Sequence, residues 1–308
     1  MKAIQFELWP ECNVGCKFCY LNKRIRKTED ADKKREMDRA EAFLLAGDMK
    51  DYTNVAFIGG EFMQGQLNTP EIRDQFFRLL QLTKDLILAG KLEGAWLSAA
   101  LTEESAVLCE VLDMFKDVVP VSKTGGFWII TSYDTIGRFH KPKSEETWKQ
   151  NMVNIKTNYP NIRCNTTIIL TQHAIERYLN SELHFHDFMD TYNTQLFFKP
   201  PHLIKGLYKD KNEMERRVPG FFVKRKDFLK FLAKVSTEEE CYVFDKICNI
   251  HFRADTLLRS GTDVPEYREK DTRYEIASET FLPCGHPFPY AGYIDSEACM
   301  LCDKLLMS

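Results

Sequence analysis

Two hydrophobic patterns alternate along the first two hundred residues of the chain. Short apolar runs rich in β-branched and aromatic residues are typical of buried strands. Longer segments between them carry apolar residues at the three- and four-residue spacing of an amphipathic helix. The expected strands are Ile4–Trp9, Asn54–Ile58, Ala95–Leu101, Phe127–Ser132, Arg163–Leu170 and Gln195–Lys199. The expected helices are Asp38–Lys50, Glu71–Ala89, Thr102–Lys116, Ser144–Thr157 and His173–Tyr192, with Thr102 and Ser144 as N-caps.

This alternation predicts an α/β fold made of parallel βαβ units. Six expected strands precede the break at Pro200-Pro201, which predicts an open or partial (βα)6 barrel over residues 1–200. Residues 201–308 show no clear alternation. We expect them to form a basic, cysteine-bearing C-terminal extension.

The composition indicates a globular protein. Hydrophobic residues make up 44% and charged residues 28% of the 308 positions, which excludes wholesale disorder, collagen-like repeats and coiled-coil rods. The apolar runs fall far short of the ~20 residues of a membrane helix. The first twelve residues lack the apolar core of a secretory signal. We therefore expect a cytoplasmic protein with no membrane partner.

Charge is unevenly distributed although the net charge is only -3. The segment from Lys199 to Lys234 holds eleven Lys or Arg against four Asp or Glu, and Lys17 to Glu36 holds eight against four. Either segment could be a solvated face or a surface for the phosphates of a nucleotide or nucleic acid. Phenylalanines that interleave the first segment could stack on bases or belong to the core: Phe221, Phe222, Phe228 and Phe231.

Three of the ten cysteines form a C-x-x-x-C-x-x-C motif directly after the first expected strand. Cys12, Cys16 and Cys19 are close enough in sequence to converge on one inorganic centre, and Gly15 gives the loop conformational freedom. Three thiolates without a nearby fourth suit a [4Fe–4S] cluster with one open iron. The alternatives are a zinc knuckle completed by a distant ligand, or three unrelated core cysteines.

These motifs resemble those of a known family. The triplet, with Phe18 before its third cysteine and Tyr20 after it, resembles the signature of radical S-adenosylmethionine (radical SAM) enzymes. The segment Val55–Glu61 looks like the second strand of that family followed by its GGE motif, although Phe62 stands where many members have proline. The expected strands and helices up to Lys199 are similar to the partial (βα)6 barrel of the family, so the resemblance covers about two-thirds of the chain.

The resemblance implies cofactors and an activity. The cysteine triplet would hold a [4Fe–4S] cluster whose fourth iron binds the amino and carboxylate groups of S-adenosylmethionine. Gly59 and Gly60 would let the backbone approach the amino group, and Glu61 or its neighbouring carbonyls would help to receive it. Reductive cleavage would give a 5′-deoxyadenosyl radical that abstracts a hydrogen atom from the substrate. An electron donor such as a flavodoxin or ferredoxin is also implied.

Further candidates lie near the C-terminal ends of the expected strands, where parallel barrels carry their active sites. By the resemblance, Ser132 is the candidate for binding the ribose. The other candidates are Ser98, Asp134, Asn165, Thr167, Lys199 and His202. Each of them could instead cap a turn or be solvated.

A second cysteine group lies at the end of the chain. Cys284, His286, Cys299 and Cys302 have the spacing of a zinc ribbon or treble clef, and a histidine ligand favours zinc. The alternatives are free cysteines or an auxiliary iron–sulfur cluster that recruits Cys241 or Cys248. Cys109 and Cys164 fall within helix and strand patterns and are expected in the core.

Three functional hypotheses remain open at this point. The first is a radical SAM enzyme that modifies a nucleotide or nucleic-acid base. The second is a radical SAM enzyme that acts on a small metabolite or matures a peptide or protein. The third is a non-catalytic iron–sulfur or zinc protein that binds nucleic acid. The sequence identifies no general acid or base.

Overall fold

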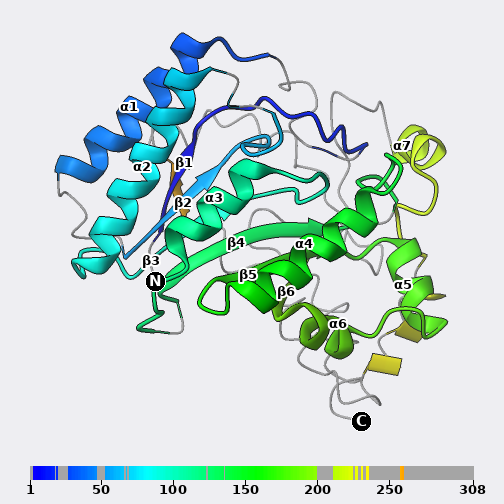
Figure 1. Ribbon diagram of the computed structural model, residues 1–308. Helices are drawn as coiled ribbons and strands as arrows, with labels where there is room; N and C mark the ends of the chain where they lie inside the picture. The colour runs from blue at the N-terminus through cyan, green and yellow to red at the C-terminus, as the bar shows by residue number, and fades with distance from the viewer. Residues whose placement is uncertain are drawn as a thin grey trace.

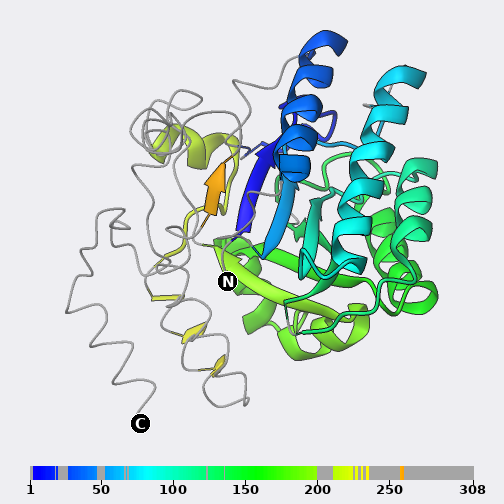
Figure 2. The ribbon, with the colours of Figure 1, turned by 90° about the vertical axis from the view of Figure 1, so that its left-hand side faces the viewer.

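Seven parallel strands form a single sheet, and the helices within residues 30–192 pack on one side of it (Figures 1 and 2). The structure is a computed structural model that describes residues 3–17, 19, 27–46, 53–65, 67, 69–122, 124–134, 136–199, 211–224, 226–227, 230–231, 234–235 and 257–259. The strands are β1 (Ala3–Glu7), β2 (Asn54–Ile58), β3 (Gly94–Ser98), β4 (Gly126–Tyr133), β5 (Arg163–Ile169), β6 (Thr194–Lys199) and β7 (Leu257–Arg259). The helices are α1 (Asp30–Ala46), α2 (Pro70–Leu88), α3 (Ala106–Phe115), α4 (Ser144–Asn158), α5 (Gln172–Leu179), α6 (Phe185–Tyr192) and α7 (Lys211–Arg217).

The strand order β6-β5-β4-β3-β2-β1-β7 follows the chain for the first six strands. Every neighbouring pair is parallel, so all strands begin at the same end of the sheet, and each connection must bring the chain back to that end. All six expected strands are present, and the α/β class with a parallel sheet is confirmed. This topology is compatible with the expected partial barrel. No described helix is long and apolar enough to cross a membrane.

The hydrophobic core lies between the sheet and the helices. Alternate side chains of β4, which are Phe127, Ile129 and Tyr133, join this core. The residues between them, including Ile130 and Ser132, therefore face the opposite side of the sheet. We call that side, which is the one opposite the helices, the inner face.

One strand is shorter than the sequence suggests. β3 ends at Ser98 rather than at Leu101. The backbone N–H of Ala100 donates to the carboxylate of Glu61, and Leu101 adopts a left-handed conformation with φ of 59°. The apolar strand pattern continues to Leu101 in the sequence. The strand ends earlier because the N–H of Ala100 is bound by the Glu61 side chain and not by a neighbouring strand.

The predicted start of α1 is wrong by eight residues. The helix begins at Asp30 instead of Asp38, because a buried stripe extends toward the N-terminus through Lys33 and Met37. Lys33 is buried and its ammonium group pairs with Glu11 at 2.7 Å, so its aliphatic stem takes the place of an apolar residue. Because lysine counts as a polar residue, the hydrophobicity pattern does not indicate this first part of the helix.

Both predicted N-caps are wrong. The hydroxyl of Ser105, not Thr102, caps α3 by accepting from the N–H of Leu108, while Thr102 is buried and hydrogen-bonds with the side chain of Gln64. The hydroxyl of Ser144 donates to the carbonyl of Lys141 at 2.8 Å instead of capping α4. Tertiary contacts compete for these hydroxyl groups.

The helix expected over His173–Tyr192 is two helices. α5 ends at Leu179, and α6 begins at Phe185. Ser181 between them has a φ of 61°, and the N–H of Glu182 donates back to the carbonyl of Arg177. A left-handed residue cannot continue a helix, so the chain turns at this point.

Candidate functional site

The cysteine triplet lies on a loop that follows β1. Cys16 is buried, whereas Cys12 and Cys19 are partly exposed. The N–H of Cys19 donates to the carbonyl of Cys16 at 3.1 Å, and Gly15 has a φ of 72°, so the loop turns tightly. Burial raises the pKa of the Cys12 and Cys16 thiols. In the part of the chain that the structure describes, no group of three or more His, Cys, Asp or Glu side chains is closed around a metal position.

The Gly-Gly segment after β2 lies directly against the chain that leads into this loop. The N–H of Gly60 donates to the carbonyl of Trp9, and the N–H of Glu61 donates to the carbonyl of Glu11, both at 2.9 Å. A Cβ at Gly59 would lie 2.2 Å from the Trp9 oxygen, and one at Gly60 would lie 1.9 Å from the Glu11 oxygen. Only glycine allows this approach. The structure therefore brings the GGE motif and the beginning of the cysteine loop together.

The carboxylate of Glu61 connects two strand ends. One oxygen accepts the N–H of Met63 at 2.9 Å, and the other accepts the N–H of Ala100 at 2.5 Å. The side chain is only 1% exposed. Burial raises its pKa to about 7 against the opposing effect of these hydrogen bonds. Glu61 thus shapes the edge of the sheet rather than presenting its oxygens to solvent.

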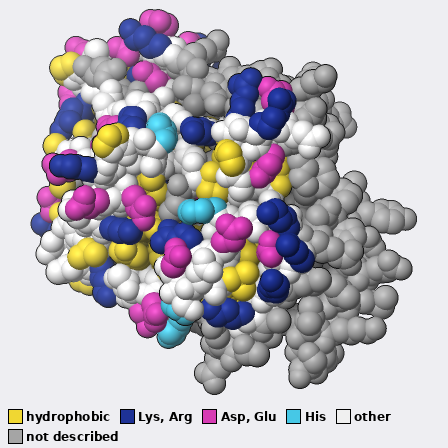
Figure 3. All heavy atoms as spheres, turned by 90° about the vertical axis from the view of Figure 1, so that its right-hand side faces the viewer, with side chains coloured by type: hydrophobic (Ala, Val, Ile, Leu, Met, Phe, Trp, Pro, Cys, Tyr) yellow, Lys and Arg dark blue, Asp and Glu magenta, His cyan; other side chains and the backbone are white. Residues whose placement is uncertain are grey.

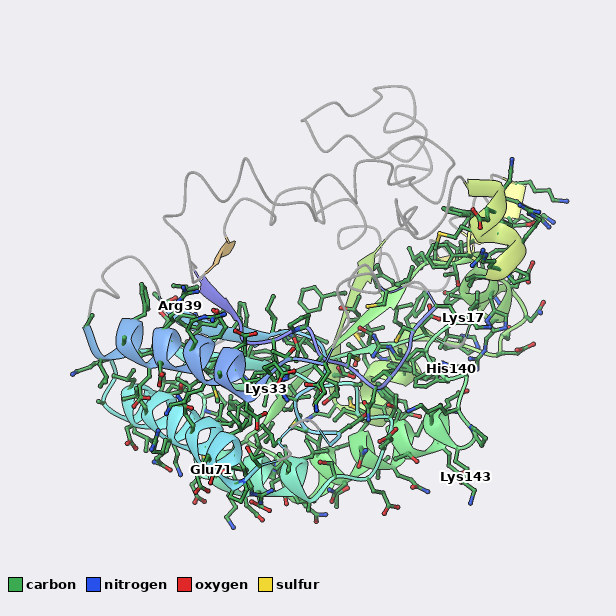
Figure 4. All side chains as sticks on the ribbon, turned by 90° about the horizontal axis from the view of Figure 1, so that it is seen from above. Lys17, Lys33, Arg39, Glu71, His140 and Lys143 are labelled. Atoms are coloured by element: carbon green, nitrogen blue, oxygen red, sulfur yellow. The ribbon has the colours of Figure 1, made fainter. Side chains whose placement is uncertain are left out.

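The loop between β4 and α4 supports the other side of the cysteine loop. The N–H of Lys17 donates to the carbonyl of Gly137 at 3.2 Å, and a Cβ at Gly15 would lie 3.4 Å from Nε2 of His140. Figure 4 shows Lys17 and His140 at the same end of the molecule. The Oδ1 of Asp134 accepts the N–H groups of Ile136 and Gly137 at 2.9 and 3.0 Å. Asp134, whose pKa burial raises to about 6, therefore holds this turn in place.

Four of the predicted strand-end candidates share the inner face. Ile130 pairs with both Ser98 and Asn165, and Ser132 pairs with Thr167. Residues paired across a parallel sheet point to the same side. All four candidates are partly exposed, and Oδ1 of Asn165 is buried with no hydrogen-bond partner among the described residues. The inner face therefore carries uncharged side chains that can form hydrogen bonds, at the end of the sheet that lies near the cysteine loop.

An apolar cluster covers the cysteine loop from the side of α7. Met214, Val218, Phe221 and Phe222 pack with Cys16 and Val14. The carboxylate of Glu215 holds the turn after α7 by accepting the N–H groups of Gly220 and Phe222 at 2.6 and 3.0 Å. The cluster excludes water from one side of the loop.

This packing decides between the two interpretations of the aromatic residues in the basic segment. Phe221, Phe222 and Phe231 are buried, so they are core residues and not a stacking surface. Lys224 and Lys226 are exposed. On the face in Figure 3, the Lys and Arg side chains are interspersed with Asp and Glu.

Two cysteines outside the triplet differ from each other. Cys164 is buried in β5, as expected, and burial raises its pKa to about 12. The prediction for Cys109 is wrong, because this residue is exposed. The buried stripe of α3 runs through Leu108, Val111 and Leu112, and Cys109 lies one position outside it.

Several predicted residues lie outside the described part of the chain. They are Phe18, Tyr20, His202, Phe228, Cys241, Cys248, Cys284, His286, Cys299 and Cys302, together with the side chain of Lys199.

The sequence did not indicate Arg138, which follows the turn held by Asp134. Burial raises the pKa of Cys12, Cys16 and Glu61, and the positive charge of Arg138 opposes that rise at each of them, so Arg138 lies near all three groups. No motif marks this arginine. Its position depends on how the β4–α4 loop folds against the cysteine loop.

No known protein-family profile matches the chain, and no curated protein matches it. Among solved structures, the chain is similar to SuiB of Streptococcus suis bound to S-adenosylmethionine, at 14% identity and a TM-score of 0.40. The match covers 86% of this chain and 48% of the SuiB chain. At this level of similarity we transfer nothing from SuiB to this chain.

Proposed function

We propose that this chain is a radical SAM enzyme that cleaves S-adenosylmethionine reductively and uses the product to abstract a hydrogen atom from its substrate. One observation carries the proposal. The Gly59-Gly60 edge is hydrogen-bonded through Gly60 and Glu61 to the two residues Trp9 and Glu11, immediately before the first cysteine of the triplet. These contacts bring the proposed cluster-binding loop and the Gly-Gly-Glu segment together, which supports the proposal of one shared site.

The donor set fits a [4Fe–4S] cluster with an open iron. Cys12, Cys16 and Cys19 supply three thiols from one tight loop, and cysteine thiolates are the usual ligands of such clusters. The apolar cluster with Met214 and Phe221 gives the loop a water-poor side, a setting that influences the reduction potential. When bound, the cluster supplies the electron that cleaves the cofactor.

The residues around the loop then have distinct tasks. The Glu61 carboxylate accepts two backbone N–H groups, so the backbone carbonyls beside it are the groups proposed to receive the cofactor's ammonium. Ser132 on the inner face is proposed to bind the ribose. Asn165 and Thr167, also on that face, are proposed to meet the substrate.

The identity of the substrate is a separate part of the proposal. Exposed Lys224 and Lys226 favour a nucleotide or nucleic acid as the first substrate to test. A small metabolite or a peptide is the second candidate, supported by the burial of Phe221 and Phe222, which are unable to stack on bases. A flavodoxin or ferredoxin as electron donor, and zinc or an auxiliary cluster at the C-terminal cysteines, remain proposals.

The test is anoxic quantification of iron, sulfide and zinc, with electron paramagnetic resonance of the reduced protein. We expect about four irons for one such cluster, a signal that changes when S-adenosylmethionine is added, and release of 5′-deoxyadenosine. Cys16→Ala should abolish all three, whereas Cys109→Ala, which removes an exposed thiol on α3, should preserve them. Zinc alone, or a cluster signal indifferent to the cofactor, would support the non-catalytic metal protein instead.

A further inference from the structure

Arg138 lies on the stretch of the β4–α4 loop that contacts the cysteine loop. Its neighbour Gly137 accepts the N–H of Lys17, and His140, two residues further on, faces Gly15. Both contacts are made to residues between the first and third cysteines. The backbone therefore places the arginine beside the proposed cluster-binding loop.

The guanidinium of Arg138 has an unused donor. Its Nε is buried and has no hydrogen-bond partner among the described residues. A buried, unpaired N–H on a charged group is costly and rare in folded proteins, so it calls for an explanation. An acceptor that occupies the site in the working protein would provide one.

The carboxylates in reach of this charge do not supply that acceptor. Glu61 uses its two oxygens for the N–H groups of Met63 and Ala100. Asp134 accepts from the backbone of its own turn. In the part of the chain that the structure describes, Arg138 forms no ion pair with either carboxyl, although its charge lies close enough to act on both.

We propose that Arg138 is a positioning residue for the cluster, offering its buried Nε–H to a sulfur acceptor and its fixed positive charge to the cluster as a whole. This role rests on the proposed function. Arginine stays protonated in proteins, so the charge is permanent. Net charge and hydrogen bonds to sulfur set the reduction potential of an iron–sulfur cluster. A neighbouring cation favours the more negative, reduced form and raises the midpoint potential.

The experiment compares four reconstituted proteins: wild type, Arg138→Gln, Arg138→Lys and Lys143→Gln. Lys143 is the matched control, because it is an exposed cation on the same loop. The measurements are iron content per chain and the midpoint potential from an anoxic redox titration followed by electron paramagnetic resonance. We expect Arg138→Gln to lower the equilibrium constant for reduction at least tenfold, a shift of about 59 mV for a one-electron couple, or to lose the cluster. Arg138→Lys should keep the cluster and recover most of the potential, and Lys143→Gln should match wild type.

Two results would overturn the role of Arg138. One is an Arg138→Gln protein with wild-type iron content and potential. The other is an Arg138→Lys protein that shifts or loses its cluster as fully as Arg138→Gln, because the charge would then be irrelevant. If the wild-type chain itself holds no cluster, or a cluster that ignores S-adenosylmethionine, the proposed function fails, and this outcome is distinct from the other two.

Discussion

The carboxylate of Glu61 accepts the backbone N–H of Ala100 at 2.5 Å, which ties the loop after β2 to the end of β3. The same residue donates its own N–H to Glu11, next to the cysteine loop. Three chain segments that are far apart in sequence therefore meet at one buried side chain. Changes at this junction should affect both stability and the proposed cofactor site.

Replacement of Gly60 should displace the cysteine loop. A Cβ at this position would lie 1.9 Å from the backbone oxygen of Glu11, so Gly60→Ala must push the two segments apart. We expect a loss of roughly 1–3 kcal/mol in the free energy of unfolding and loss of the cofactor-induced spectral change. The control is Cys109→Ala, which introduces alanine at an exposed position on α3. Equal behaviour of the two variants in urea unfolding and spectroscopy would contradict the proposed close approach.

Glu61 should make stability depend on pH. Its pKa of about 7 in the folded protein exceeds the ordinary value of 4.5, so the fold prefers the protonated carboxyl. This contribution is fully present below about pH 4.5 and is lost as the pH rises through 7. Relative to Glu61→Gln, the wild type should lose about 3 kcal/mol of stability between these limits. Urea unfolding of both proteins across this range measures the difference.

Glu71→Gln is the control for that experiment. Glu71 is an exposed carboxylate in the first turn of α2, and Figure 4 labels it on the outer side of the helix. A stability difference between wild type and Glu61→Gln that does not change with pH would show that the pKa of Glu61 is the same in the folded and the unfolded chain, and would contradict the prediction.

Two cysteines outside the triplet should differ in their reactivity toward an alkylating reagent. Cys109 is exposed on α3, and Cys164 is buried with its pKa raised to about 12. The thiolate is the reactive form, so iodoacetamide at neutral pH should label Cys109 in the folded protein and leave Cys164 unmodified. Peptide mass spectrometry before and after denaturation gives the result. Early labelling of Cys164 would mean that β5 is open to solvent.

Ser132 should contribute to cofactor affinity. It lies on the inner face, paired with Thr167, where a hydroxyl can hydrogen-bond to the ribose. Ser132→Ala should weaken S-adenosylmethionine binding by about 1 kcal/mol, or roughly fivefold, without changing the iron content. The control is Ser122→Ala, in the segment that precedes β4 at the opposite end of the same strand. Unchanged affinity in calorimetry would exclude Ser132 from the ribose site.

The exposed lysines after α7 test the nucleic-acid substrate. If they contact phosphates, the double variant Lys224→Glu and Lys226→Glu should weaken RNA or DNA binding and reduce the magnitude of its salt slope by about two. Lys34→Glu with Lys91→Glu makes the same charge change elsewhere on the surface. Fluorescence anisotropy at several salt concentrations measures both. Equal effects of the two pairs would favour the metabolite or peptide alternative.

Much of the fold could be predicted from local patterns. Six strands and most of their helices are visible in the alternation of apolar runs, because each element buries one face and its period records that burial. The failures have tertiary causes. Lys33 buries a charged residue at a core position of α1, and Ser105 replaces Thr102 as N-cap because another side chain engages Thr102.

The candidate site could be predicted only in part. The sequence by itself determined the cysteine triplet and the Gly-Gly-Glu segment, since both are contiguous motifs whose chemistry depends on residue type and spacing. Tertiary structure alone decided that Gly60 meets Glu11, that Ala100 binds Glu61 and that Arg138 lies beside the cysteine loop. These contacts join residues that are distant in sequence. Neither a hydrogen bond between such residues nor the position of a charged side chain produces a periodic pattern of hydrophobic residues that could be recognised in the sequence.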